Sequence, residues 1–184
     1  LYHALIHPNV LSDVNGEYPA MESAEIRTAE GNRYTVFSLW DTYRNLHQLM
    51  TLVYPERQLE MVRSTIGMYE EWGWLPEWEL CGGEAFAMEG DPAIPVVVDA
   101  WMKGLLDFDM DAAYEAMRKS ATTPGAQNRI RPDIDPIIEQ GSVPLGFSAL
   151  DLSCVHSVSH ALAECIAYQA PSSLSDSNGQ QNYA

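Results

Sequence analysis

The sequence has few basic residues, no paired cysteine motif and no long apolar run. Only 10 Lys and Arg stand against 26 Asp and Glu in 184 residues, and the net charge is -16. So acidic a chain repels phosphate groups, which makes nucleic acid and anionic membrane surfaces poor candidate partners. The longest apolar run is far below the ~20 residues that a membrane-spanning helix needs. Cys81, Cys154 and Cys165 form no CxxC pair and no even-numbered framework, so we expect free or buried thiols.

Several familiar site motifs are missing as well. The chain carries no phosphate-binding loop, dinucleotide fingerprint or nucleophile elbow. "SDVNGEY" contains only part of a calcium loop, so we expect a turn there. His156 and His160 are four residues apart, but "HSVSH" lacks the glutamate of a zinc-binding HExxH, and a plain helix face is expected.

The residues that are present predict mostly helices. Leu46, Leu49, Met50 and Val53 recur at steps of three and four, which indicates one amphipathic helix that ends before Pro55. Pro55 suits the first turn of a second helix, for which Gly73 is the stop. "IPVVVDAWMKGLL" predicts a deeply buried third helix, and Asp109 is the expected N-cap of a fourth over "MDAAYEAMRKSA". A last helix is predicted at about 155–168.

The stretches between these helices read as irregular loops, and only "RYTVF" hints at a strand. Helices with long, aromatic-rich loops predict an all-α fold, such as an α/α toroid, whose loops build a site at one end. The first residues already follow a helical pattern and no initiator Met precedes them, so we expect an internal segment of a longer protein. Residues 171–184 form a separate polar tail with a composition typical of mobile segments.

The stretch "LCGGEAFAMEG" places Glu84 between two glycines and apolar residues. Burial disfavours the charged carboxylate, so the pKa of Glu84 should rise, as a general acid near neutral pH requires. The alternative is an ordinary acidic residue in the first turn of a helix.

Two aromatic segments are candidates for binding a sugar. In "FSLWDTYR", Trp40 could pack on a pyranose ring while Asp41 and Arg44 exchange hydrogen bonds with its hydroxyls. The alternative is a core tryptophan beside an N-cap aspartate that pairs with Arg44. "WGWLPEWEL" adds Trp74 and Trp78, which suit either a carbohydrate platform or the filling of a core under a loop.

Taken together and in order, these stretches resemble the catalytic domain of glycoside hydrolase family 92. The matching segments are "LYHALIHPNVLSDVNGEY", "YTVFSLWDTYRNLHQLMTLVYPE", "GWLPEWELCGGEAFAMEGDPAIPVVVDAWMKG", "FDMDAAYEAM" and "SVSHAL". The resemblance implies a calcium-dependent, exo-acting α-mannosidase that inverts the anomeric centre. It also implies that residues 1–170 are part of an (α/α)6 barrel, with an N-terminal β-sandwich and the remainder of the barrel outside this chain.

The resemblance also assigns roles to residues. Glu84 corresponds to the general acid, and Trp40, Asp41 and Arg44 would line the mannose pocket, with Trp74 and Trp78 expected near it. The ligands of calcium and the catalytic base have no identified counterpart here. The expected substrate is a mannan or a high-mannose glycan with α-1,2 or related linkages, and a periplasmic or secreted location is favoured.

Three departures from the family pattern keep other functions open. Gly83 precedes the acid where Asn or Ser is usual, and "SVSHALAECIAYQAPSS" has Ala163 or Glu164 where a glutamate is expected and lacks an acidic run that follows. We therefore expect this segment by itself to be inactive. The alternatives are a degenerate homologue that binds glycans without cleaving them and a generic all-α interaction domain.

Overall fold

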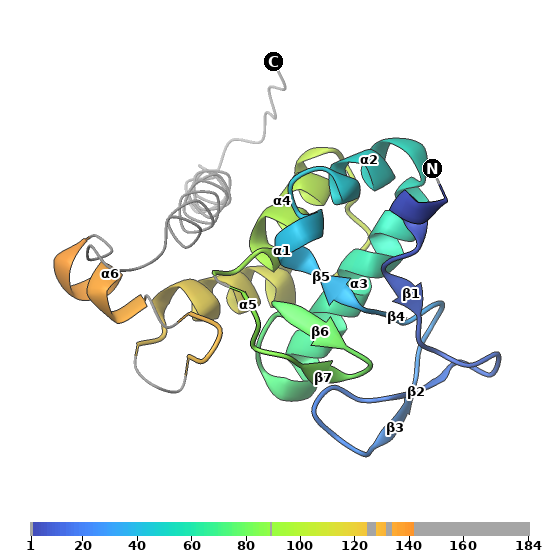
Figure 1. Cartoon of the computed structure of the whole chain (residues 1–184), viewed down its shortest axis with the longest axis horizontal. Helices are drawn as coiled ribbons and strands as arrows, with labels where there is room; N and C mark the ends of the chain where they lie inside the picture. The colour runs from blue at the N-terminus through green and yellow to red at the C-terminus, as the bar shows by residue number, and fades with distance from the viewer. Residues whose placement is uncertain (1, 89, 125–127, 132–133, 142–184) are drawn as a thin grey trace, which may run out of the picture.

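The computed structural model describes residues 2–88, 90–124, 128–131 and 134–141. Helices pack at the centre of this part, and short strands lie along one side of them (Figure 1). The helical elements are η1 (His3–Leu5), α1 (Leu39–Thr42), α2 (Leu46–Val53), α3 (Pro55–Trp72), α4 (Ala93–Met102), α5 (Met110–Thr122) and α6 (Ile134–Gln140). The strands are β1 (Asn9–Val10), β2 (Glu17–Pro19), β3 (Ile26–Thr28), β4 (Tyr34–Thr35), β5 (Phe37–Ser38), β6 (Trp78–Leu80) and β7 (Gly83–Glu84).

The long helices lie where the apolar spacing predicts them. α3 begins at Pro55, whose missing N–H costs nothing in a first turn, and ends at Gly73, which adopts a left-handed conformation with φ of 94°. The side chain of Asp109 accepts a hydrogen bond from the Ala112 N–H and so caps α5 as predicted. The predicted helix at 155–168, both of its histidines and the polar tail lie outside the described residues.

The predicted all-α fold, a partial (α/α)6 barrel, is wrong for the described residues. The seven strands form three antiparallel sheets, in which β1 pairs with β4, β2 with β3, and β6 with both β5 and β7. Each strand is only two or three residues long, which is too short for alternating polar and apolar residues to reveal it. Two stretches that read as irregular loops therefore hold the β2–β3 and β6–β7 hairpins.

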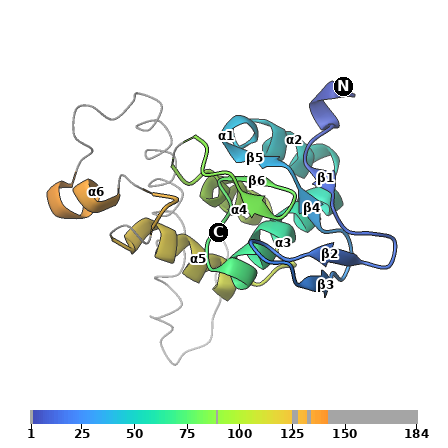
Figure 2. The same cartoon turned by 60° about the horizontal axis from the view of Figure 1, so that its bottom comes forward.

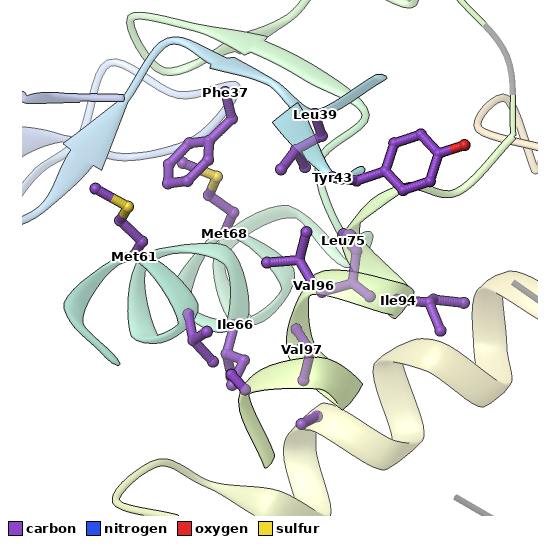
Figure 3. Packing of buried hydrophobic residues seen from close by; sticks show 14 of the residues in the cluster. Phe37, Leu39, Tyr43, Met61, Ile66, Met68, Leu75, Ile94, Val96 and Val97 are labelled. Carbon is purple, nitrogen blue, oxygen red and sulfur yellow. The ribbon is translucent and has the colours of Figure 1, made fainter. Parts of the chain in front are cut away.

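The core lies between the helices and the sheet that contains β5. Phe37 and Leu39 pack against Met68 of α3 and Val96 of α4 (Figure 3). α4 is buried nearly all round, as its apolar composition predicts. The core thus fixes β5 and α1 against α3 and α4, and β6 and β7 continue the same sheet outward.

α2 buries only part of the face that its apolar spacing predicts, since Met50 belongs to the core and Leu46 packs against it. Leu49 and Val53 are largely exposed, whereas His47, Met50 and Thr51 are buried. His47 is fully buried between two polar side chains: its Nδ1 lies 3.0 Å from Oε1 of Gln58, and its Nε2 lies 3.0 Å from Oγ1 of Thr42. These contacts tie α1, α2 and α3 together.

Candidate functional site

The sheet formed by β5, β6 and β7 assembles most of the predicted site residues. Ser38, the last residue of β5, is directly opposite Trp78 of β6, and Glu79 of β6 is directly opposite Glu84 of β7. α1, which carries Trp40 and Asp41, follows β5 without a gap. Both views place α1 and β5 next to this hairpin (Figures 1 and 2). Two motifs about 40 residues apart in sequence therefore meet through a sheet that sequence patterns do not show.

Glu84 lies on a strand and not at the start of a helix, and it is only 7% exposed. Its Oε2 accepts a hydrogen bond from the Glu77 N–H at 2.9 Å. Its Oε1 accepts from the Trp78 N–H at 2.8 Å and from the Phe86 N–H at 3.2 Å. Since a carboxylate oxygen has two lone pairs, Oε2 is the atom with room for a proton or a further donor.

No cation neutralises Glu84 among the residues that the structure describes. Burial raises the pKa of its carboxyl group, and the backbone N–H donors of Glu77, Trp78, Phe86 and Ala85 oppose that rise. Glu71 shows the contrasting case of a buried glutamate with a structural role, because its Oε2 forms an ion pair with Arg33 at 2.8 Å. Desolvation without a neutralising cation disfavours the charged form of a carboxyl group, which is the direction that a general acid requires.

Strained backbone conformations concentrate around Glu84. In the described part of the chain, five residues other than glycine have a positive φ, and all five belong to this hairpin or adjoin it. They are Glu22, Val36, Cys81, Phe86 and Met88. Such conformations cost ~1–3 kcal/mol each and persist where the surrounding structure holds them, which is most often at functional sites. Of the two glycines before Glu84, only Gly82 has a positive φ (86°), and Cys81 supplies the other left-handed position of the turn.

The residues of the "SLWDTYR" segment divide into buried and exposed groups. Trp40 belongs to the core and is 6% exposed, so its ring is mostly covered by protein. The Arg44 guanidinium lies over the rings of Trp40 and Tyr43, at 4.8 and 4.9 Å from their centroids. Asp41 is exposed and accepts a hydrogen bond from the Ser38 hydroxyl instead of pairing with Arg44. The polar groups of Asp41 and Arg44 are thus at the surface, and the buried Trp40 ring packs beneath the Arg44 guanidinium.

Trp74 and Trp78 are both half-buried but differ in their surroundings. The Lys119 ammonium lies 4.6 Å from the centroid of the Trp74 ring, so one face of this ring already contacts a cation. The backbone of Trp78 is next to Glu84, since its main-chain N–H donates to that carboxylate. Of the two, Trp78 is the one that the fold brings to the candidate acid.

Sequence reasoning missed the side chains that hold the hairpin. Glu79 is fully buried, and its carboxylate accepts hydrogen bonds from Thr35 Oγ1, the Val36 N–H and the Gly82 N–H. The Glu22 carboxylate accepts a hydrogen bond from the Glu84 N–H at 2.6 Å. The adjacent glycines in "ELCGGE" signal a tight turn, but the observed turn is centred on Cys81 and Gly82, and only this register places Glu79 opposite Glu84.

The described residues do not offer a ligand set for calcium. Calcium takes six to eight oxygen ligands, commonly with several carboxylates among them. Within the described ranges, no group of three or more Asp, Glu, His or Cys side chains gathers to hold an ion. The carboxylates nearest to Glu84, those of Glu22 and Glu79, already accept hydrogen bonds from the backbone. We therefore assign no metal ligand and no step that involves a metal.

Three hollows on the surface are described, and none of them is lined by Glu84. One lies between α3 and residues 106–109, one lies at the loop of residues 12–16, and one, of mainly apolar character, lies beside α2. No helix in the described part is long and apolar enough to cross a membrane.

Known proteins place this arrangement in context. Residues 1–184 match the family model described as the glycosyl hydrolase family 92 catalytic domain. A search of curated proteins finds no match. The fold is similar to a solved family GH92 alpha-mannosidase from Bacteroides thetaiotaomicron, with 31% identity and a TM-score of 0.77 over 92% of this chain and 23% of that one.

Two further solved structures are similar to the same degree. One is that alpha-mannosidase in complex with mannoimidazole, with 31% identity and a TM-score of 0.76 over 91% of this chain and 23% of that one. The other is a family GH92 inverting mannosidase from the same organism, with 29% identity and a TM-score of 0.77 over 92% of this chain and 24% of that one. The chain therefore spans about a quarter of the length of the structures that it matches.

Proposed function

Because this chain belongs to glycosyl hydrolase family 92, we propose that the protein hydrolyses terminal α-mannosidic linkages by a single displacement in which Glu84 is the general acid. The observation that carries the proposal is the state of Glu84. Its carboxyl group is buried without a cation partner in a hairpin surrounded by strained backbone. The solved relatives support the sugar, since one of them is described as an alpha-mannosidase and one of its two structures is a complex with mannoimidazole.

The reaction follows from the position of one proton. Protonated Glu84 gives its proton to the glycosidic oxygen as the bond from that oxygen to the anomeric carbon breaks. A water molecule forms the new bond to the anomeric carbon from the opposite face and loses a proton to a second carboxylate. In an inverting enzyme that base stands ~6.5–9.5 Å from the acid, and we assign no residue of the described part to it.

The sugar would lie over the sheet edge where α1 meets the hairpin. Asp41 and Arg44 offer an acceptor and a donor for mannose hydroxyls, and Trp78, whose backbone N–H donates to Glu84, offers a half-buried aromatic ring. Trp40 would act from below as a support, because its ring is covered. Trp74 is the weaker candidate for a sugar platform, given the lysine against its ring.

We propose, from the resemblance, that this site lies between the catalytic domain and an N-terminal β-sandwich. Calcium remains part of the proposal for the whole protein, with ligands that we do not assign. The proposed substrates are α-1,2-linked or related mannans and high-mannose glycans, and the proposed location is periplasmic or secreted.

A second candidate function is glycan binding without hydrolysis, and one observation favours it. Three backbone N–H groups donate to the carboxylate of Glu84, and such bonds favour its charged form over the protonated form of an acid. The interaction-domain alternative loses its basis, because the fold is not all-α and the chain belongs to a hydrolase family.

Product analysis separates the two functions. The full-length protein is incubated with an α-1,2-linked mannobiose while the anomeric protons are followed by NMR. Hydrolysis with inversion releases β-mannose first, which then mutarotates. Retention would contradict the single displacement, and binding without release of mannose would establish the second candidate.

A further inference from the structure

Glu79 and Glu84 are joined through the geometry of one tight turn. β6 and β7 are connected by Cys81 and Gly82, with Leu80 opposite Gly83 and Glu79 opposite Glu84. Both central residues of the turn have a positive φ, of 51° and 86°, as in type I′ hairpins. The register of the hairpin, and with it the face on which Glu84 stands, depends on this turn holding its shape.

The side chain of Glu79 holds that turn from inside the protein. Its Oε1 accepts a hydrogen bond from the Gly82 N–H at 2.6 Å and one from Thr35 Oγ1 at 2.8 Å. The same Thr35 oxygen accepts the Cys81 N–H at 2.8 Å. The two central N–H groups of the turn are thus both bound by one buried carboxylate and its hydroxyl partner.

The second oxygen of Glu79 ties the turn to a strained residue. Oε2 accepts a hydrogen bond from the N–H of Val36 at 3.0 Å. Val36 has φ of 63°, which is an outlying conformation for a β-branched residue. It stands between Thr35 of β4 and Phe37 of β5, so its conformation sets where β5 and the following α1 begin. One carboxylate therefore joins the turn that precedes Glu84 to the residue that precedes β5.

We propose that Glu79 is a positioning residue for Glu84: it fixes the Cys81–Gly82 turn and Val36 so that the Glu84 carboxyl group reaches the leaving-group oxygen. This inference rests on the proposed function of Glu84. It assigns no proton transfer and no contact with substrate to Glu79. The loss of Glu79 should slow some substrates and not others, because only substrates that need the general acid depend on the position of Glu84.

The substitution Glu79→Gln tests this in the full-length protein with two substrates. A mannobiose has a poor leaving group that needs the acid, whereas dinitrophenyl α-mannoside has a good one that does not. Since a misplacement of ~1 Å can cost ~10²-fold, we expect kcat/KM for the mannobiose to fall by about that factor. For the dinitrophenyl substrate we expect a change below ~3-fold, because the sugar pocket is retained.

Glu71→Gln is the matched control. Glu71 is also a buried glutamate that accepts three hydrogen bonds, from the Tyr18 hydroxyl, the Met21 N–H and Arg33. Its loss should affect stability and leave the ratio of the two kcat/KM values unchanged. If Glu79→Gln lowers both substrates equally, as a structural defect would, the positioning role is wrong.

Two further arms keep the outcome decisive. If Glu79→Gln does not fold, Thr35→Val is measured instead, because it removes the hydroxyl that joins Glu79 to the turn and should give the same selective loss. Thr35→Ser, which keeps that hydroxyl, should retain the wild-type kcat/KM for the mannobiose. Without that pattern the proposal fails. Glu84→Gln is measured in parallel. A selective loss in Glu84→Gln without one in Glu79→Gln overturns only the positioning role, whereas no selective loss in Glu84→Gln overturns the proposed function itself.

Discussion

Glu79 and Glu84 stand directly opposite each other in the β6–β7 ladder, and both carboxyl groups are buried. Burial raises the pKa of each, against the hydrogen bonds that each accepts. They differ in what they hold. Glu79 binds a turn and a strained strand, whereas Glu84 binds the loop that precedes β6 and keeps one oxygen with spare capacity. Two like residues at opposing positions thus suit two different tasks.

The raised pKa of Glu84 predicts a pH dependence of activity. A general acid works in its protonated form, so kcat/KM for a mannobiose should fall as the pH rises through the pKa of Glu84, which lies above its ordinary value. For dinitrophenyl α-mannoside this fall of kcat/KM at high pH should be absent. Identical pH profiles for both substrates would show that the fall reports the ionisation of a group other than Glu84. The measurement is kcat/KM from pH 4 to 9 for the full-length protein.

His47 should make the fold less stable in acid. Burial lowers its pKa to about 4, while the unfolded chain binds a proton near ~6.5. The free energy of unfolding therefore includes the full benefit of a neutral His47 above pH ~6.5. This benefit is lost as the pH falls toward 4, and the total loss is about 3 kcal/mol. The free energy of unfolding of wild type and His47→Gln, measured from pH 7 to 4.5, should show a steeper fall for the wild type. Parallel slopes would contradict a neutral buried histidine.

Gly67 should be required by the buried ion pair beside it. A Cβ atom at this position would lie 2.6 Å from the Nη1 atom of Arg33, whose guanidinium is held by Glu71 and cannot move aside easily. Gly67→Ala should lower the free energy of unfolding by about 2–4 kcal/mol, even though alanine favours a helix.

The control for Gly67 is the same change in an Arg33→Lys background. Lysine has no atom equivalent to Nη1 of arginine, so the space beside residue 67 should be free. In this background Gly67→Ala should leave the free energy of unfolding unchanged or raise it by up to ~1 kcal/mol. Equal losses in both backgrounds, measured by denaturant unfolding, would exclude the contact with Arg33 as the cause.

Cys81 should be replaceable with a gain in stability. It is exposed and occupies the first central position of the hairpin turn with φ of 51°, where asparagine followed by glycine is preferred. Cys81→Asn should raise the free energy of unfolding by about 0.5–1 kcal/mol, while Cys81→Ser, which lacks this preference, should not. A loss in Cys81→Asn would show that the cysteine side chain itself has a role.

The sequence predicts the helices well because each signal is local. Pro55 and Gly73 bound α3, and Asp109 caps α5, through interactions within one turn of the chain. The sheet could not be predicted in this way, since its strands are held by contacts between residues 35–38 and 78–84. The same distance hid Glu79, because Thr35 and Val36, two of its three partners, are far along the chain, and it hid His47, whose burial depends on Gln58 of another helix.

For the site, the resemblance identified Glu84, and the residue pattern gave the direction of its pKa. What sequence could not provide was its environment. Apolar neighbours were expected from "AFAM", yet Met88 is exposed and backbone N–H groups surround the carboxylate instead. For Trp40 the sequence leaves a sugar platform and a core tryptophan both open, because the two have the same local sequence, and the structure places the ring in the core.

The most direct test of the central claim is the leaving-group dependence of Glu84→Gln. In the full-length protein, kcat/KM is measured for an α-1,2-linked mannobiose and for dinitrophenyl α-mannoside, in wild type and variant. A lost general acid should lower the rate for the mannobiose by ~10²–10⁴-fold and leave the dinitrophenyl substrate within a few fold. A wild-type rate on the mannobiose would contradict the assignment of Glu84 as the acid.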